Sequence, residues 1–271
     1  MAGSSTCGGK LLDLQLKDKV VLITGGARGI GAAISEACLA EGAMVVMVNR
    51  DSEEAQSFAA RLRKEGKPCE LLPIELHGPE TCKNAVDQAL RLWGRIDALV
   101  NNAGSNDKIG LESGTPQEFI DSIHRNLWHY YSMTHYALAS LKTARGAIVN
   151  ISSKTAVTGQ GGTSGYAAAK GAQLALTREW AVELLPYGIR VNAIVPSEVM
   201  TPLYRRWLST FPNADEKLRT ITQRIPLGQR MTEAAEIANM AVFLLSEKSG
   251  HTTGQHLYVD GGYVHLDRAL S

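Results

Sequence analysis

The chain has 271 residues, of which 44% are hydrophobic and 20% charged, as in soluble globular proteins with a full core. A formal net charge of +1 argues against nucleic-acid and membrane partners, because both need a large basic surface. No apolar run has the pattern of a signal peptide or the length of a membrane span, so we expect a cytoplasmic protein that acts on a small molecule.

Short apolar runs alternate with amphipathic stretches after a flexible N-terminal tail at residues 1–15. We expect strands at Val20–Thr24, Met44–Val48, Leu71–Leu76, Ala98–Val100, Ala147–Ile151, Arg190–Val195 and His256–Val259. We expect helices at Gly29–Ala40, Glu53–Lys64, Thr81–Trp93, Phe119–Leu141, Tyr166–Leu185 and Ala234–Leu245. This alternation predicts an α/β, doubly wound Rossmann fold in which one domain, residues 16–271, has a seven-stranded, mainly parallel sheet with helices on both faces.

One segment, residues 197–230, interrupts this alternation. It contains three prolines and the aromatic residues Tyr204, Trp207 and Phe211. Long insertions in a compact domain are usually functional, so we interpret the segment as a lid over a substrate pocket. A contact between subunits is the alternative.

A glycine-rich loop follows the first strand and opens directly into a helix. Glycines in that position let the backbone turn tightly and approach a pyrophosphate, whose charge then lies at the positive end of the helix. The strand before the loop and the helix after it make a dinucleotide site the favoured reading. The cofactor-binding residues expected in this segment are Gly25, Arg28, Gly29, Ile30 and Gly31.

The end of the second strand bears on the choice between NADP and NAD. NAD-binding proteins usually place a carboxylate there to hold the adenosine ribose, but this chain has Asn49 followed by Arg50. Arg50 and Arg28 would attract the extra phosphate of NADP, whereas a carboxylate would repel it. We therefore expect NADP, with NAD as the alternative because Asp51 is adjacent.

Tyr166 and Lys170 lie one turn apart on the same face of a predicted helix, and Ser152 and Ser153 end the strand before it. Such a set suits removal of a proton from an alcohol. A free tyrosine has a pKa of about 10 and is a weak base at neutral pH, and a nearby lysine cation lowers that pKa by favouring the phenolate. A serine hydroxyl could hold the substrate oxygen.

Several motifs in order resemble the short-chain dehydrogenase/reductase family from about Leu16 onward. They are Thr24–Gly31, Asn101-Asn102-Ala103-Gly104, Asn126, Ser153, Tyr166, Lys170 and Val259-Asp260-Gly261-Gly262. The resemblance implies an NAD(P)-dependent oxidoreductase acting on CH–OH groups without a metal. In that reading Tyr166 is the general base, Ser153 orients the substrate and Ser152 is the fallback.

The same resemblance assigns further positions. Lys170 would lower the pKa of Tyr166 and bind the nicotinamide ribose, and Asn126 would hold a water in a proton relay. The adenosine side would be lined by Asn102, Ala103, Gly104, Glu75 and Leu76, and the nicotinamide carboxamide would be held by Val199 and Thr201. Glu75 stands where the family commonly has an aspartate, and Ser197 follows Pro196 where the family often has a glycine.

The candidate substrate residues are polar, which favours a sugar over a flat hydrophobe. They are Asn106, Ser153, Gln160, Tyr166 and Glu198, with Asp107 beside the first of them. Within the family, the stretches 152–160, 171–180, 198–205 and 265–270 are similar to bacterial L-fucose dehydrogenases. That similarity implies oxidation of L-fucose or a related aldose at C1 to the lactone.

Two other functions stay open. One is a 3-oxoacyl-carrier-protein reductase or another ketone reductase of the same family, since Arg205, Arg206 and Lys217 would suit an acidic partner protein. The other is a dinucleotide sensor without catalysis, which would not need a tuned proton relay. The family resemblance also implies a homotetramer.

Overall fold

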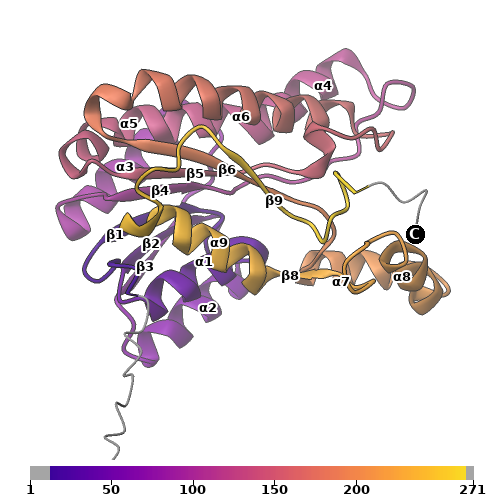
Figure 1. Cartoon of the computed structure of the whole chain (residues 1–271), viewed down its shortest axis with the longest axis horizontal. Helices are drawn as coiled ribbons and strands as arrows, with labels where there is room; N and C mark the ends of the chain where they lie inside the picture. The colour runs from indigo at the N-terminus through magenta and orange to yellow at the C-terminus, as the bar shows by residue number, and fades with distance from the viewer. Residues whose placement is uncertain (1–12, 267–271) are drawn as a thin grey trace, which may run out of the picture.

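Seven parallel strands form the central sheet of the computed structural model, which describes residues 13–266 (Figure 1). In the order β3-β2-β1-β4-β5-β6-β9, every neighbouring pair is parallel, which confirms the predicted fold. The strands are β1 (Val20–Thr24), β2 (Met44–Asn49), β3 (Cys69–Pro73), β4 (Ala98–Asn101), β5 (Ala147–Ile151), β6 (Arg190–Pro196) and β9 (His256–Val259). All residues of β1, β4 and β5 are buried, because helices cover the sheet on both faces.

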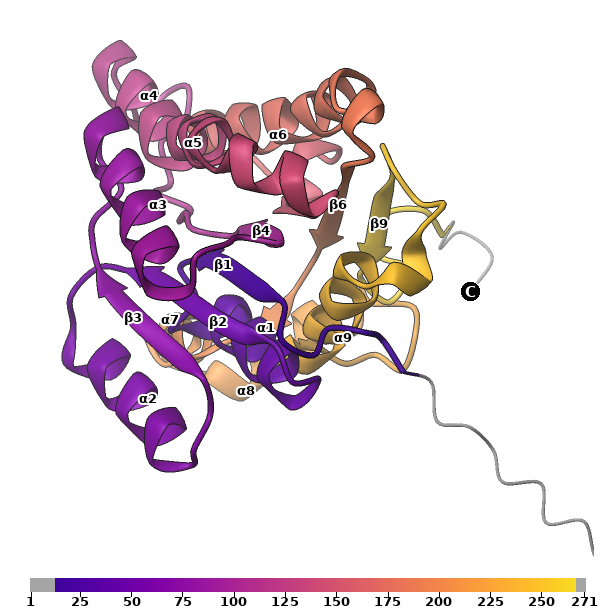
Figure 2. The same ribbon diagram turned by 90° about the vertical axis from the view of Figure 1, so that its left-hand side faces the viewer.

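Two layers of helices enclose the sheet, as Figures 1 and 2 both show. One layer contains α1 (Gly29–Ala40), α2 (Glu53–Lys64) and α9 (Ala234–Leu245), and the other contains α3 (Pro79–Trp93), α4 (Pro116–Ile123), α5 (His129–Ala144) and α6 (Ser164–Glu183). Each face of the sheet has its own hydrophobic cluster. Of the expected N-terminal tail, Leu14 packs against the first cluster, and residues 1–12 lie outside the described part of the chain.

The helix expected at Phe119–Leu141 is interrupted by a π turn. The segment forms α4, a π-helical turn at His124–Trp128, and then α5. The turn has Asn126 buried at its centre. A single π turn widens the helix by only about one residue, which is too small a change for the hydrophobic pattern of the sequence to reveal.

Two expected features differ in detail. Strand β3 ends at Pro73, which pairs with Asn49 at the last position of the ladder, so Glu75 and Leu76 lie in the loop beyond it. Residues 197–230 contain β7 (Val199–Met200), α7 (Pro202–Leu208) and α8 (Ala214–Thr222), which lie beside the main body in Figure 1. Strand β7 pairs with β8 (Thr232–Glu233) in a separate two-stranded sheet.

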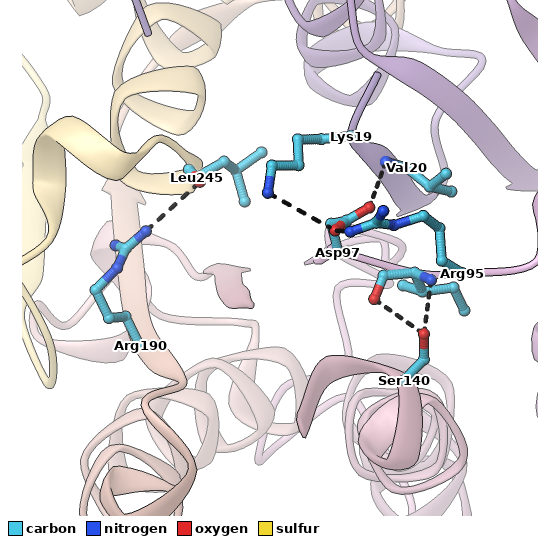
Figure 3. A network of polar contacts seen from close by, with 8 residues as sticks. Lys19, Val20, Arg95, Asp97, Ser140, Arg190 and Leu245 are labelled. Carbon is cyan, nitrogen blue, oxygen red and sulfur yellow. Dashed lines mark hydrogen bonds and ion pairs between the residues drawn. The ribbon is translucent and has the colours of Figure 1, made fainter. Parts of the chain in front are cut away.

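Asp97 joins three elements at the amino edge of the sheet (Figure 3). Its carboxylate is 6% exposed, accepts a 2.9 Å hydrogen bond from the backbone N–H of Val20, and pairs with Arg95 at 2.5 Å and Lys19 at 4.0 Å. Next to it, the Ser140 hydroxyl of α5 bonds both backbone groups of Ile96. These contacts fix the starts of β1 and β4 to each other and to α5.

Arg190, at the start of β6, closes the C-terminal end of α9. Its guanidinium donates to the backbone carbonyls of Leu244 at 2.7 Å and Ser246 at 3.0 Å, and to the hydroxyl of Ser249 at 2.7 Å. The last carbonyls of a helix lack partners within the helix and carry partial negative charge, so an arginine suits them. Arg190 therefore holds α9 against the sheet.

Among residues 13–266 we find no helix with both the length and the apolar character that crossing a membrane requires. Within the same range no three histidine, cysteine or acidic side chains gather as a possible metal site.

Substitution Asp97→Ala should lower the free energy of unfolding by about 1–3 kcal/mol, because it leaves the buried N–H of Val20 without an acceptor. Thermal or urea unfolding of the purified protein measures the change. Asp87→Ala is the matched control, since Asp87 forms an exposed helix pair with Lys83 and should matter much less. Equal losses in the two variants would contradict the role given to Asp97.

Candidate functional site

The carboxyl ends of β1, β4, β5 and β6 meet at one edge of the sheet, opposite the Asp97 contacts. The glycine loop follows β1, Asn102 follows β4, Ser152 and Ser153 follow β5, and Ser197 follows β6. In open parallel sheets ligands bind in the crevice at this edge.

The glycine loop can approach a phosphate closely. A Cβ on Gly31 would lie 2.1 Å from the Gly25 carbonyl oxygen, and Gly25 itself has φ +66°. Helix α1 starts without a side-chain cap, because its N-cap residue Arg28 makes no capping hydrogen bond. The first N–H groups of α1 are thus left to an external anion, so the loop fits a dinucleotide pyrophosphate.

Asn102 fastens the loop after β4 to the glycine loop. Its side-chain amide donates to the carbonyls of Thr24 at 2.9 Å and Gly25 at 3.3 Å. In return, the hydroxyl of Thr24 accepts hydrogen bonds from the N–H groups of Asn102 and Ala103. Asn102 therefore shapes the dinucleotide crevice through the protein's own backbone.

Two glycines, Gly29 and Gly104, lie close to residues of other loops between the glycine loop and Lys170. A Cβ on Gly29 would lie 3.5 Å from Cγ2 of Thr201, so the loop after β6 reaches the phosphate loop. A Cβ on Gly104 would lie 2.8 Å from Oδ1 of Asn126 and 3.9 Å from Nζ of Lys170. Gly104 therefore leaves no room for a side chain, and its loop lies directly against Asn126 and Lys170.

The residues expected near the adenosine end lie around the end of β2. Arg28 pairs with Glu54 at 3.0 Å, and Arg50 lies 3.9 Å from Glu75. The side-chain amide of Asn49 donates to the Arg50 carbonyl. Leu76 and Ile30 pack against the hydrophobic clusters, and Val199 is buried.

Tyr166 lies next to Ser153 rather than Ser152. The Ser153 hydroxyl hydrogen-bonds the Tyr166 phenol, whereas the Ser152 hydroxyl donates to the Lys170 backbone carbonyl at 2.9 Å. Burial raises the pKa of Tyr166 to about 12, the bond from Ser153 opposes this, and the charge of Asp107 adds to it. Tyr166 is therefore a neutral phenol in the ligand-free protein at neutral pH.

Lys170 is a buried cation whose three N–H donors all have partners. Its Nζ donates to the Ile151 carbonyl at 2.7 Å, to Oε1 of Gln173 at 3.2 Å and to the Tyr130 hydroxyl at 3.3 Å. Nζ also lies 5.5 Å from the centre of the Tyr166 ring. Burial lowers the pKa of Lys170 to about 7, so its charge at neutral pH depends on these acceptors.

Asn126 is engaged at every polar group of its side chain. Its Oδ1 accepts from the N–H of Ser105 at 2.8 Å, and its Nδ2 donates to the Ser122 carbonyl at 3.0 Å. Its backbone carbonyl accepts a 2.7 Å hydrogen bond from Nε2 of Gln173. The Gln173 side chain therefore binds Asn126, the residue at which the family resemblance places a water.

Gln173 is absent from the residues expected from the sequence. It is fully buried and contacts both Lys170 and the π turn. A signal was available, because Tyr166, Lys170, Gln173 and Thr177 follow one another at spacings of four, three and four residues, which is one face of a helix. A polar stripe on a buried helix indicates an internal network.

Glu198, expected to need a polar substrate as partner, has partners in the protein. Lys154 pairs with Oε1 of Glu198, and the Tyr204 hydroxyl donates to Oε2 at 2.7 Å. Burial and the Glu198 charge raise the pKa of Tyr204. The Lys154 ammonium also lies 4.1 Å from the centre of the Tyr263 ring. This ion pair ties the loop after β5 to the loop after β6.

Asp107, rather than Asn106, has the buried side chain in the loop after β4. Its side chain is 8% exposed, its Oδ2 pairs with Arg125 at 3.0 Å, and its Oδ1 has no hydrogen-bond partner within residues 13–266. Asn106 is exposed and accepts from the Lys108 N–H, and Gln160 is exposed as well. Asp107 is thus the carboxylate that acts on Tyr166.

Comparisons with known proteins give consistent relatives. A family model described as enoyl-(acyl carrier protein) reductase matches residues 25–264. L-fucose dehydrogenase from Bos taurus is 38% identical over 90% of this chain and 88% of its own length. The 3-oxoacyl-[acyl-carrier-protein] reductase of Thermotoga maritima is 35% identical over 93% of this chain and all of its own.

Among solved structures, Cj0485 dehydrogenase is 48% identical, with a TM-score of 0.91, over 96% of this chain and 99% of that one. These matches and the arrangement of the carboxyl edge agree with the motifs read from the sequence. The chain belongs to the short-chain dehydrogenase/reductase family of nicotinamide-dependent oxidoreductases.

Proposed function

We propose that this enzyme oxidises L-fucose or a related aldose at C1 to the lactone. The observation that carries this proposal is the buried Oδ1 of Asp107, which meets no donor among residues 13–266 and lies close enough to Tyr166 to influence its charge. A buried carboxylate oxygen without a partner is costly, and a sugar hydroxyl beside the reacting carbon would supply the missing hydrogen bond. The identity to L-fucose dehydrogenases supports the same substrate class.

The residues around Tyr166 divide the proton chemistry among them. Ser153 holds the C1 hydroxyl oxygen, and the Tyr166 oxygen takes the hydroxyl proton as the C1–O bond becomes a carbonyl. A nicotinamide dinucleotide held at the carboxyl edge of the sheet would supply the acceptor for the hydride from C1. The Lys170 cation favours the phenolate form of Tyr166, which burial and Asp107 oppose.

We further propose that the preferred dinucleotide is NADP, with NAD as the alternative. Arg28 and Arg50 are held near the end of β2 by Glu54 and Glu75 in pairs that are largely exposed. Exposed ion pairs are weak, so a 2′-phosphate could replace the glutamates at small cost. Arginine binds phosphate with two parallel hydrogen bonds, which favours NADP further.

A second candidate function is reduction of a 3-oxoacyl group on a carrier protein. A cavity of about 130 Å³ next to Glu198 and Tyr263 is lined by Lys217 and Arg224, and such cations would attract an acidic carrier or its phosphate. The identity to the Thermotoga maritima reductase supports this candidate. Residues 197–230, which supply the two cations, are the segment that we propose as a lid.

We infer a homotetramer for the assembled enzyme. Trp128 and Tyr131 are exposed near the start of α5, and Val182 is exposed near the end of α6. Large exposed hydrophobic side chains on neighbouring helices are typical of subunit interfaces. Of the stretch at 265–270 that is similar to bacterial L-fucose dehydrogenases, residues 267–270 lie outside the described part of the chain.

The purified protein should reduce NADP or NAD with L-fucose and D-arabinose, and Tyr166→Phe should lower kcat by about 10²–10⁴-fold because the general base is lost. Dinucleotide absorbance measures turnover, and fluorescence titration should show that the variant still binds dinucleotide. D-glucose, simple secondary alcohols and oxoacyl substrates complete the panel. Turnover of oxoacyl substrates alone would replace the sugar proposal with the second candidate.

Asp107→Asn should lower kcat/KM for L-fucose by about 10–100-fold, because an amide replaces a charged acceptor. Turnover of a simple secondary alcohol should not fall, since the lost charge is one that raises the pKa of Tyr166. Asp121→Asn, on the exposed side of α4, is the control and should leave both substrates unaffected. A parallel fall for sugar and alcohol would argue against recognition of the sugar by Asp107.

Replacing either arginine should reduce the preference of the enzyme for NADP over NAD. Arg28→Ala and Arg50→Ala should each lower kcat/KM for NADP by about 10-fold or more and change it little for NAD, because only NADP carries the extra phosphate. Steady-state kinetics with each dinucleotide at saturating substrate give the ratio. Arg63→Ala, whose arginine pairs with Glu70, is the control. Equal losses with both dinucleotides would contradict the assignment.

A further inference from the structure

The π turn and the proton-transfer lysine are joined by one side chain. Gln173 lies on α6 one turn after Lys170, is fully buried, and spans from Nζ of Lys170 to the backbone carbonyl of Asn126. The two contacts are 3.2 Å and 2.7 Å long. Helix α6 and the π turn between α4 and α5 are therefore linked by an amide.

The orientation of the amide is set by its two partners. The Asn126 carbonyl can only accept a hydrogen bond, and the Lys170 ammonium can only donate. The Gln173 amide serves both at once, with its nitrogen toward Asn126 and its oxygen toward Lys170. The Gln173 amide also hydrogen-bonds the Tyr130 hydroxyl, which is another acceptor of Lys170.

We propose that Gln173 is a positioning residue that ties Lys170 directly to the Asn126 turn and keeps the buried ammonium charged. This inference rests on the proposed roles of Tyr166 and Lys170. An amide oxygen that accepts from an ammonium favours the charged form, and that charge is what stabilises the Tyr166 phenolate. A water can accept one proton while it passes on another, whereas an amide does not exchange protons readily, so this link positions Lys170 and does not itself relay a proton.

The other groups facing Lys170 do not replace this contact. From α5, Tyr130 is a hydroxyl with its own bond to the Ile151 carbonyl, and His129 is a buried imidazole whose pKa is lowered to about 4, first by burial and then by Lys170. Tyr166 and Ser153 are neutral in the ligand-free protein, and Asp107 acts on Tyr166. The Ile151 carbonyl and Gln173 are thus the main acceptors that hold the charge.

The test compares Gln173→Leu, which removes both contacts, with Gln173→Glu, which returns an acceptor to Lys170. Thr177→Val is the matched control, because Thr177 is buried on the same face of α6 and bonds Gln173 and Asn150 without contacting Lys170. NMR titration of lysine side chains in the dinucleotide-free protein measures the Lys170 pKa, with Lys170→Met identifying the signal. Thermal unfolding verifies that each variant is folded.

We expect Gln173→Leu to lower the Lys170 pKa by about one unit, since the charged form loses an acceptor. Gln173→Glu should restore the Lys170 pKa to its original value or above. Thr177→Val should lower the melting temperature and leave the Lys170 pKa unchanged. With any alcohol that the enzyme oxidises, the acidic limb of kcat/KM in Gln173→Leu should shift to higher pH. An unchanged Lys170 pKa in Gln173→Leu, or an equal shift in Thr177→Val, would overturn the proposal.

The titration needs neither substrate nor dinucleotide, so it separates this inference from the proposed function. If L-fucose is not oxidised but Lys170 titrates as expected, the substrate proposal fails and the role of Gln173 stands. If the sugar is oxidised but the Lys170 pKa is the same in Gln173→Leu, the substrate proposal stands and the role of Gln173 fails.

Discussion

The cost of burying the Lys170 ammonium organises the centre of this protein. An unpaired charge in the interior is far less stable than in water, so each of its three donors has to meet an acceptor. Those acceptors come from β5, from α5 and from α6 itself, through Ile151, Tyr130 and Gln173. Strand and helices therefore have one relative arrangement in which the lysine is satisfied.

The two halves of the site share a second constraint at the ends of β1 and β4. Thr24 and Asn102 exchange hydrogen bonds, so the phosphate loop and the loop that begins the substrate side cannot move independently. The same β4 loop carries Gly104 against Asn126 and Lys170. A change in the glycine loop would thus be felt at Asn126 and Lys170 through contacts within the protein.

The fold and the main site could be predicted from the sequence because their signals are local and repeated. Strands buried on both faces are continuous apolar runs, and the glycine loop and Tyr166–Lys170 pair stand at fixed places beside them. The π turn was not predictable, since a helical hydrophobic pattern runs through it without a break. The ion-pair partner of Glu198 and the burial of Asp107 rather than Asn106 were not predictable either. Both depend on which loop residues come into contact, and Lys154, which contacts Glu198, lies 44 residues before it in the sequence.

Strand β6 connects the amino edge of the sheet to the loop that contains Glu198. It is paired on both sides, with β5 and with β9, so it cannot slide along its own axis without breaking two ladders of hydrogen bonds. Its first residue, Arg190, is hydrogen-bonded to the end of α9. The strand ends at Pro196, and Glu198 follows two residues later. The contact between Arg190 and α9 at one edge of the sheet therefore sets the position of Glu198 at the other edge, about 20 Å along the strand.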